Sequence, residues 1–299
     1  MLKEAFIIIC CSTLFFGTVR AETSGVISDI RIAADNSNPD SQLSLGRKFY
    51  SGDGVEKNHE DALKLVRLAA EKGFTKAQYY LGELYYKGEG IDQNYTKAAK
   101  WFRLAALQGM PEAQYNLGVL YAAGKGVVQD LSEAVKWYRL AADQGDEKAQ
   151  YNLGVSYAAG KGVVQDFSEA VKWYRSAADQ GHSMAQNNLG VMYAKGSGVA
   201  QNYTEAAKWF CLAATQGNVK AQITLGLMNE NGYGIAKNVA EARNWYRLAA
   251  AKGSSIAQKK LVELGQGHAY NESKSSSLHQ LALDQPHDSG YVNLQTISN

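Results

Sequence analysis

The stretch AQYNLGVSYAAGKGVVQDFSEAVKWYRSAADQG, residues 149–181, decides the fold, because its pattern returns every 36 residues along the chain. Residues 114–145 and 150–181 differ from each other at only three positions, Leu120/Ser156, Leu131/Phe167 and Leu140/Ser176. The glutamine of the pattern keeps this interval without a gap at Gln42, Gln78, Gln114, Gln150, Gln186, Gln222 and Gln258. A period of this length is typical of stacked helical repeats. The sequence therefore predicts an all-α, α/α solenoid of about six 36-residue helix-turn-helix repeats.

Each repeat is predicted to contain two helices joined by a glycine turn. Ala113 and Leu117 stand at the i, i+4 spacing of one helix face. This first helix should end at Gly124, since glycine adopts the positive φ of a helix C-terminus without strain. A second helix should begin after Asp130, an N-cap residue, with Glu133 three residues later completing a reciprocal capping box.

Other positions of the pattern support these helix boundaries. Pro39 and Pro111 both fall at the predicted first turn of a first helix, where a missing amide hydrogen costs nothing. The capping box recurs as Asp166 with Glu169, Asn202 with Glu205, and Asn238 with Glu241. Asn94 and Asn202 lie in glycosylation sequons, but both are predicted N-caps, so we interpret the sequons as fortuitous.

The second helix of each repeat is predicted to bury a tryptophan. The five tryptophans of the chain share one column: Trp101, Trp137, Trp173, Trp209 and Trp245, with Leu65 at this position in the first repeat. A small pair such as Ala141–Ala142 follows in each repeat and lets neighbouring helices approach closely. We therefore predict that the tryptophan column is the structural core of the repeats.

On these residues the chain resembles the Sel-one-like repeat family, a branch of the tetratricopeptide superfamily with a slightly longer unit. The resemblance is carried by residues 149–154, by the turn at 160–163, and by Asp166, Trp173 and Gly181. It implies right-handed stacking of antiparallel helix pairs. It also implies a scaffold for protein interaction, in envelope regulation, in the assembly of envelope complexes or in contact with a host cell.

The two ends of the chain depart from the repeat pattern. Residues 1–21 combine a lysine, an apolar run and small or aliphatic residues before Ala21, a layout typical of a secretory signal. We therefore predict cleavage after Ala21, a periplasmic or secreted protein, and no stable membrane span after cleavage, because the apolar run is short for a bilayer. The remaining predicted segments are a half-repeat capping helix over 22–38, six repeats over 39–254, a C-terminal capping helix over 255–266, and a polar, disordered tail over 267–299.

Helical geometry predicts where a partner binds. The side of each first helix opposite its buried stripe should line the inner, concave wall of the solenoid. Exposed tyrosine and asparagine beside small apolar residues suit a peptide, because rings provide contact area and amides bond its backbone. The predicted partner-binding residues are Tyr79, Tyr115, Asn116, Val119, Tyr151, Asn152, Val155 and Asn188. Alternatively, part of this set packs one first helix on the next, and the sequence leaves both interpretations open.

The sequence contains little that is typical of catalysis. It has no Ser-x-x-Lys, the nucleophile motif of penicillin-recognising serine enzymes, and no His-Glu-x-x-His, the motif of zinc peptidases. The net charge of +2 provides no strong field for nucleic acid or an acidic membrane surface. We predict that the protein is not an enzyme, uses no cofactor or metal, and does not bind nucleic acid.

The number and placement of the cysteines bear on a second function that the family resemblance suggests. Some secreted members of the family staple each helix pair with a disulfide, and those members are linked to penicillin binding. By analogy, the alternative is a peptidoglycan- or β-lactam-binding enzyme. Here Cys211 is the one cysteine left after signal cleavage, and it replaces the arginine found at Arg67, Arg103, Arg139, Arg175 and Arg247. We therefore favour a monomeric, non-enzymatic scaffold with a protein or peptide partner in its concave groove.

Overall fold

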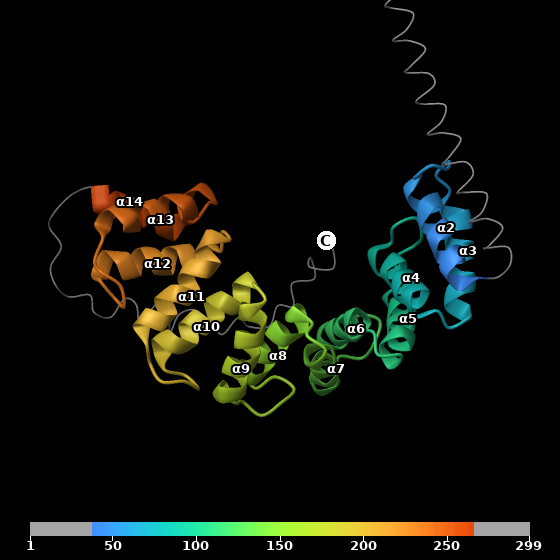
Figure 1. Cartoon of the computed structure of the whole chain (residues 1–299), viewed down its shortest axis with the longest axis horizontal. Helices are drawn as coiled ribbons and strands as arrows, with labels where there is room; N and C mark the ends of the chain where they lie inside the picture. Colours follow the sequence, from blue (N-terminus) through green and yellow to red (C-terminus); the bar gives the residue numbers. More distant parts are fainter. Residues whose placement is uncertain (1–37, 266–299) are drawn as a thin grey trace, which may run out of the picture. The chain divides into compact units, whose positions relative to one another are not determined.

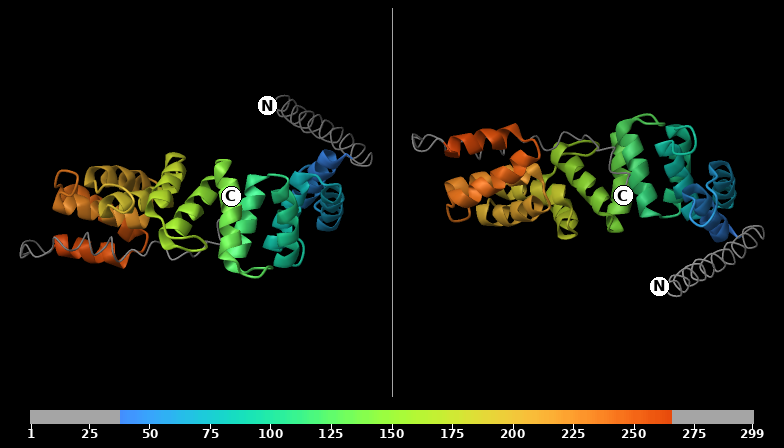
Figure 2. Two further views of the ribbon diagram at one scale, coloured as in Figure 1. Left: turned by 90° about the horizontal axis from the view of Figure 1, so that it is seen from below. Right: turned by 90° about the horizontal axis from the view of Figure 1, so that it is seen from above.

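The computed structural model of the protein describes residues 38–265, and within that range it contains thirteen helices and no strand (Figures 1 and 2). The first helices of the repeats, here called A helices, are α2 (Pro39–Ser51), α4 (Thr75–Lys87), α6 (Pro111–Ala123), α8 (Glu147–Ala159), α10 (Ser183–Lys195) and α12 (Val219–Asn231). The second helices, here called B helices, are α3 (His59–Glu71), α5 (Tyr95–Leu107), α7 (Leu131–Asp143), α9 (Phe167–Asp179), α11 (Tyr203–Thr215) and α13 (Val239–Ala251). A last helix, α14 (Ser255–Gly265), follows the sixth repeat.

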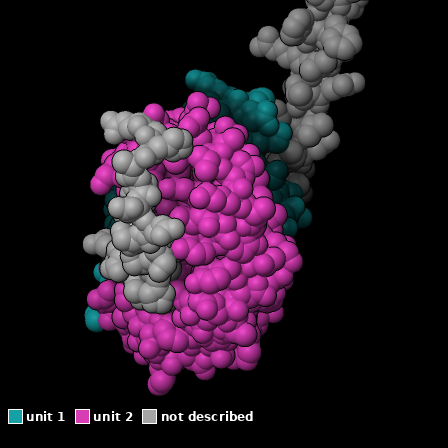
Figure 3. All heavy atoms as spheres, turned by 90° about the vertical axis from the view of Figure 1, so that its left-hand side faces the viewer, with its two compact units in different colours: residues 1–120, 124–128 teal, residues 121–123, 129–299 magenta. Residues whose placement is uncertain are grey.

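The helices form two compact units, which Figure 3 distinguishes by colour. Unit 1 extends to Leu120 and includes Gly124–Val128, while unit 2 contains Tyr121–Ala123 and the chain from Gln129 onward. In unit 1, α2 packs on α3, α3 on α4, and α4 on α5. In unit 2, every helix from α7 to α13 packs on the helix that follows it. Packing between sequence neighbours is what holds a solenoid together, so the predicted all-α solenoid is confirmed.

Several predictions concern the ends of the chain. The signal peptide, the tail over 267–299 and, except for Asn38, the capping helix over 22–38 lie outside the described residues. Helix α14 occupies the place of the predicted C-terminal capping helix. Among the helices of residues 38–265, none combines the length and the apolar character that crossing a bilayer requires.

The helix boundaries agree with the prediction from glycine, proline and N-cap residues. Helix α6 ends at Gly124, which has φ 65° and donates its amide to the carbonyl of Leu120. Pro39 and Pro111 occupy the first turns of α2 and α6. The side chain of Asn94 accepts from the amide of Lys97, so this sequon asparagine is an N-cap. Asn202 caps α11 in the same way.

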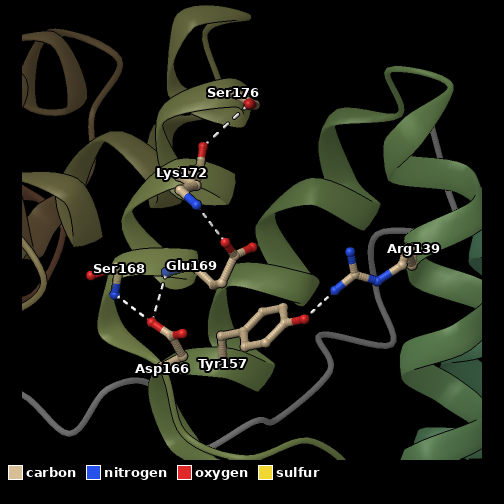
Figure 4. Close-up of polar contacts among 7 residues, drawn as sticks. All are labelled: Arg139, Tyr157, Asp166, Ser168, Glu169, Lys172 and Ser176. Atoms are coloured by element: carbon tan, nitrogen blue, oxygen red, sulfur yellow. Dashed lines mark hydrogen bonds and ion pairs between the residues drawn. The ribbon is translucent and has the colours of Figure 1, made fainter.

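The predicted capping box forms only in part. Asp166 Oδ1 accepts from the amides of Ser168 and Glu169, at 2.8 and 3.0 Å (Figure 4). The reciprocal bond from the glutamate to the cap amide is replaced, because the Asp166 amide donates to the carbonyl of Tyr157 at 3.0 Å. Glu169 instead pairs with Lys172 at 2.5 Å. The preceding A helix therefore satisfies the cap amide, and the glutamate side chain remains on the outer surface.

The tryptophan column lies at the edge of the core, and the prediction that it forms the core needs correction. Trp137 is 7% exposed, but Trp101, Trp173, Trp209 and Trp245 are only partly buried. In the five B helices that have the tryptophan, the next residue is the more deeply buried one: Phe102, Tyr138, Tyr174, Phe210 and Tyr246. Neighbouring residues point about 100° apart around a helix, so a shift of one position moves a side chain from the core to its margin.

The Leu-Gly pair of the motif has a direct packing explanation. A Cβ added to Gly154 would lie 2.6 Å from Cδ1 of Tyr174, the buried ring of the same repeat. Gly82 stands in the same relation to Phe102, and Gly226 to Tyr246. The glycine therefore brings the A-helix backbone directly against the ring of its own B helix.

Candidate interaction surface

The predicted partner-binding residues lie in three columns of the A helices, which we call the A-helix face. In unit 2 these columns contain Tyr151, Asn152 and Val155 and their equivalents 36 and 72 residues later. In unit 1 the corresponding positions of α4 are Tyr79, Tyr80 and Glu83. Helical spacing places the three columns on one side of each A helix.

Most of the predicted binding residues are more buried than the sequence indicated. Tyr115, Asn116 and Val119 are 6%, 4% and 1% exposed, and Tyr151 and Val155 are also buried. The part-buried members of the set are Tyr79, Asn152 and Asn188. The prediction that these side chains stand exposed on an open wall is therefore wrong for five of the eight.

Contacts between successive helices account for part of this burial. The ring of Tyr79 lies 5.7 Å from that of Phe102, and its hydroxyl accepts from Asn116 Nδ2 at 3.4 Å. The ring of Tyr151 lies 6.0 Å from that of Tyr174 and stacks on His182 of the following A helix at 4.7 Å. These tyrosines fill the seam between consecutive repeats, as the alternative interpretation of the sequence proposed.

The glutamine column, the most regular feature of the sequence, links one repeat to the next. Gln150 is buried and its Nε2 donates to the carbonyl of Ala142 on the preceding B helix at 3.2 Å. Gln180 Nε2, in the following inter-repeat turn, donates to Gln150 Oε1 at 2.8 Å and to the carbonyl of Gly145 at 3.0 Å. The same three bonds recur around Gln78 with Gln108 and around Gln186 with Gln216. Sequence reasoning recognised the column by its period but did not predict the bonds that it makes.

An arginine of each B helix forms a second link. Arg139 donates to the hydroxyl of Tyr157 on the next A helix (Figure 4). Its guanidinium also lies 5.8 Å from the ring centroid of Trp173. Arg175 repeats this arrangement with Tyr193 and Trp209.

At one joint both partners of this link are replaced together. Cys211 stands in the arginine column, and Asn229, 18 residues later, stands where the four preceding repeats have a tyrosine, Tyr85, Tyr121, Tyr157 and Tyr193. Asn229 Nδ2 turns to the carbonyl of Leu225 within its own helix. Cys211 is exposed, and it is the free cysteine of the described residues. The cysteine is thus one half of a paired replacement.

In unit 1 the surface around the A-helix face is charged and aromatic. Arg47 lies over the ring of Tyr80 at 4.7 Å, and the hydroxyl of Tyr50 donates to Glu89 at 3.1 Å. Partial burial, together with the bond to Glu89, raises the pKa of Tyr50 to about 12. Burial likewise raises the pKa of Glu83 above the ordinary range of a carboxyl.

In unit 2 the corresponding surface is apolar and rich in amides. Asn152 and Asn188 are part-buried, and Val191 and Leu227 are buried beside them in the valine column. Burial lowers the pKa of Lys195, at the end of α10. A surface of this composition can contact apolar side chains and can form hydrogen bonds with a polypeptide backbone.

Within residues 38–265 no group of three or more His, Cys, Asp or Glu side chains is placed to hold a metal ion. His182 is largely buried and serves as the N-cap of α10, its Nδ1 accepting from the amide of Ala185 at 3.2 Å. Burial, with a smaller effect from Lys148, lowers the pKa of His182 to about 4. The imidazole is therefore neutral near pH 7, as its acceptor role requires.

Stacked helix hairpins, each bound to the next by side-chain amides, define an α-solenoid of the tetratricopeptide type. The Sel1 repeat model matches six consecutive stretches, residues 39–74, 75–110, 111–146, 147–182, 183–218 and 219–254. The chain belongs to the Sel1 repeat family. A repeat scaffold of this kind supports a role in protein interaction.

Two solved structures illustrate the likeness. One is c5321, a protective antigen present in uropathogenic Escherichia coli strains and displaying an SLR fold; it is 37% identical, with a TM-score of 0.78 over 87% of this chain. The other is the Sel1 repeat protein from Oxalobacter formigenes, which is 39% identical, with a TM-score of 0.63 over 71% of this chain and 85% of its own. The chain spans only 56% of the c5321 chain. No curated protein matches the sequence.

Proposed function

We propose that the protein is an exported, non-enzymatic scaffold that binds a partner protein or peptide along its A-helix face. The observation that carries this proposal is the composition of that face in unit 2, where part-exposed Asn152 and Asn188 recur one repeat apart beside apolar residues. A row of amides at the repeat interval suits a partner that runs across successive A helices.

The exposed side of the B helices also favours the A-helix face as the binding surface. On the B helices, Lys136 pairs with Glu133 at 2.9 Å and Lys172 with Glu169 at 2.5 Å, and these lysine side chains are 72% and 69% exposed. Exposed ion pairs of this kind are ordinary features of a solvated helix and contribute little to stability or binding. Lys136 and Lys172 are thus already paired within their own helices, which favours the A-helix face over these lysines as the binding surface.

Export is proposed from the sequence of residues 1–21, with cleavage after Ala21 and release into the periplasm or beyond the cell. Edman sequencing of the protein from a periplasmic or culture fraction should begin at Glu22. A chain that retains Met1 would contradict the proposed compartment.

The c5321 antigen gives one setting for such a scaffold. That protein is described as protective and as present in uropathogenic strains, and we propose by likeness that this chain also works at the cell envelope or against a host. Since the chain spans about half of that antigen, its partners and oligomeric state are proposed independently, with a monomer as the starting hypothesis.

The test compares two faces of one protein. The exported chain, immobilised at one site, is used to capture partners from an envelope extract, which are identified by mass spectrometry. Asn152→Lys with Asn188→Lys should remove specific partners while leaving helicity and thermal stability near wild type. The matched control, Lys136→Glu with Lys172→Glu, should retain them. If the control loses the partners and the asparagine variant keeps them, the outer face carries the function.

The enzymatic alternative has a direct assay. Purified protein is incubated with a chromogenic β-lactam, and the expected result is no hydrolysis above the rate of buffer. A turnover that scales with protein concentration would require a catalytic role that the proposed scaffold does not include.

A further inference from the structure

Helix α5 differs from the other B helices in the charges of its exposed side. Its third residue is Lys97, whereas the third residue of every other B helix is an acid: Asp61, Glu133, Glu169, Glu205 and Glu241. Its last residue is Leu107, whereas α3, α7 and α9 end on an acid: Glu71, Asp143 and Asp179. Helix α5 therefore carries three cations, Lys97, Lys100 and Arg103, and no acidic residue. The net charge of +2 for the whole chain does not reveal this local concentration.

The exposed lysines of α5 lack the ion pairs found on neighbouring B helices. The lysines of α7, α9 and α11 pair with the glutamate three residues earlier, at 2.9, 2.5 and 2.5 Å. Lys100 has Lys97 at that place, and within residues 38–265 neither of the two forms an ion pair. Lys97 Nζ lies 5.1 Å from the ring centroid of Tyr85, and Lys100 Nζ lies 5.8 Å from that of Trp101. An aromatic ring attracts an ammonium group without accepting strong hydrogen bonds, so both lysines keep N–H donors for an anion.

Exposed leucines continue the same side of the helix. Lys97, Lys100, Leu104 and Leu107 follow one another at intervals of three, four and three residues, which places them along one side of α5. Leu104 is 36% exposed and Leu107 is 68% exposed, more than any other leucine of residues 38–265. We call these four residues the α5 outer stripe. The stripe therefore joins two exposed ammonium groups to two exposed apolar side chains.

We propose that the α5 outer stripe docks the protein on a bilayer surface that contains anionic lipids. The lysine ammonium groups donate to lipid phosphates, and Leu104 and Leu107 enter the boundary between head groups and acyl chains. Lys125 adds a further cation near the start of the helix, with its Nζ 4.8 Å from the ring centroid of Tyr95.

The leucines decide between a membrane and an acidic protein as the partner. An acidic protein matches the lysines alone, whereas a bilayer interface offers anionic groups and apolar chains side by side over its whole area. The inference concerns a different surface from the A-helix face and does not depend on partner binding there.

The test measures binding to vesicles of stated composition. The protein is purified from Glu22 onward, so that the apolar run within residues 1–21 takes no part. Wild type should co-sediment with vesicles of equal parts phosphatidylglycerol and phosphatidylcholine, but not with phosphatidylcholine alone, and binding should decrease as salt is raised. The decisive variant is Lys97→Glu with Leu107→Asp, which gives α5 the acids that α7 already carries. Its binding should fall more than about tenfold, because each unit of charge near such a surface changes affinity about fivefold.

Two controls separate the stripe from general charge effects. Lys208→Glu with Leu212→Asp makes the same substitutions on the exposed side of α11 and should bind as wild type does. Lys97→Arg with Lys100→Arg keeps the charge of the stripe and should also retain binding. Circular dichroism and melting curves of all variants should stay near wild type, because the substituted side chains are exposed. If the acidic variant melts early, Lys97→Gln with Lys100→Gln takes its place and should weaken binding about 25-fold.

The remaining outcomes contradict the inference. If wild type shows no preference for anionic vesicles, or if the α11 control loses as much binding as the α5 variant, the stripe is not a membrane site. If wild type instead captures an acidic protein that the α5 variant loses, and binds no vesicles, the stripe contacts a protein and the lipid inference is wrong. None of these results depends on the asparagine variant of the A-helix face, so the two proposals can fail separately.

Discussion

The side chain of Gln180 donates to Gln150 Oε1, thirty residues earlier in the chain, at 2.8 Å. Gln150 in turn donates to the carbonyl of Ala142 on the preceding B helix. This relay joins α7, the buried Gln150 of α8 and the exposed C-cap residue of α9 through side-chain amides and one backbone carbonyl. The relay recurs at Gln78 and Gln186, and Gln114 and Gln222 make its bond to the carbonyl of the preceding B helix, which gives a physical reason for the glutamine at these five positions.

Replacing Gln150 by leucine should destabilise the array. The change removes two hydrogen bonds, at a cost of about 0.5–1.5 kcal/mol each, because the Ala142 carbonyl still accepts from the Gly145 amide and Gln180 is exposed to water. Urea denaturation followed by circular dichroism would measure it. Gln258→Leu is the matched control, because the glutamine at that end of the column is exposed and should tolerate the change. Equal effects at the two positions would show that the relay contributes nothing.

When an aromatic residue of a B helix is replaced by alanine, the loss in the free energy of unfolding should depend on how deeply the ring is buried and not on its size. Tyr174 is fully buried against Gly154, so Tyr174→Ala should lose about 3–5 kcal/mol, as is typical of a buried aromatic residue. Trp173→Ala, its neighbour, should lose less, because that ring is only partly buried. Chemical denaturation of the two variants gives the order directly. A larger loss at Trp173 would restore the tryptophan column as the core.

Restoring the missing arginine link should require two substitutions. Cys211→Arg alone has no tyrosine to meet, and Asn229→Tyr alone has no arginine. Together they should recreate the Arg139–Tyr157 arrangement, with a coupling free energy of about 1 kcal/mol in a double-mutant cycle. Thermal melts of the four proteins would supply the cycle. If the two substitutions change the free energy of unfolding additively, the arginine–tyrosine hydrogen bond contributes no stability, and the native links such as Arg139–Tyr157 should contribute none either.

Stability should fall in mild acid because His182 caps α10 in its neutral form. Its pKa is lowered from 6.5 to about 4, so the unfolded chain binds the proton first as pH falls. The stabilisation is fully present above pH 6.5 and is lost as pH falls from 6.5 to about 4. Asn218 occupies the equivalent position of α12 and caps through Oδ1, so His182→Asn should keep the cap and flatten this part of the pH profile. A melting temperature with the same pH dependence in both proteins would exclude His182 as the source.

The sequence predicted the local features of the fold well because these depend on a few adjacent residues. The glycine C-cap at Gly124 and the N-cap at Asp130 follow from backbone preference alone, and both are present. The column of buried rings was missed because periodicity does not tell which of two adjacent aromatics, such as Trp173 and Tyr174, faces the neighbouring helix. Gly154 is a glycine because a Cβ there would clash with the ring of Tyr174, which identifies Tyr174 as the inward-facing residue. This contact can be recognised only once the two helices are placed together.

The candidate site was harder to predict because it depends on how repeats meet. Tyr115 and Tyr151 lie on the predicted side of their helices, yet both are buried. Exposure on that side is set by the approach of successive A helices, which no single repeat encodes.

The links between repeats also bear on how such a chain can grow. Each link joins residues at a constant interval: 8 from Ala142 to Gln150, 18 from Arg139 to Tyr157, and 30 from Gln150 to Gln180. A tandem copy of any 36-residue segment therefore carries both halves of every bond in register, and the new junctions are complementary as soon as they are made. Unequal recombination within the gene would then lengthen or shorten the protein without an intermediate that fails to fold. The near-identity of residues 114–145 and 150–181 is the expected trace of such an event.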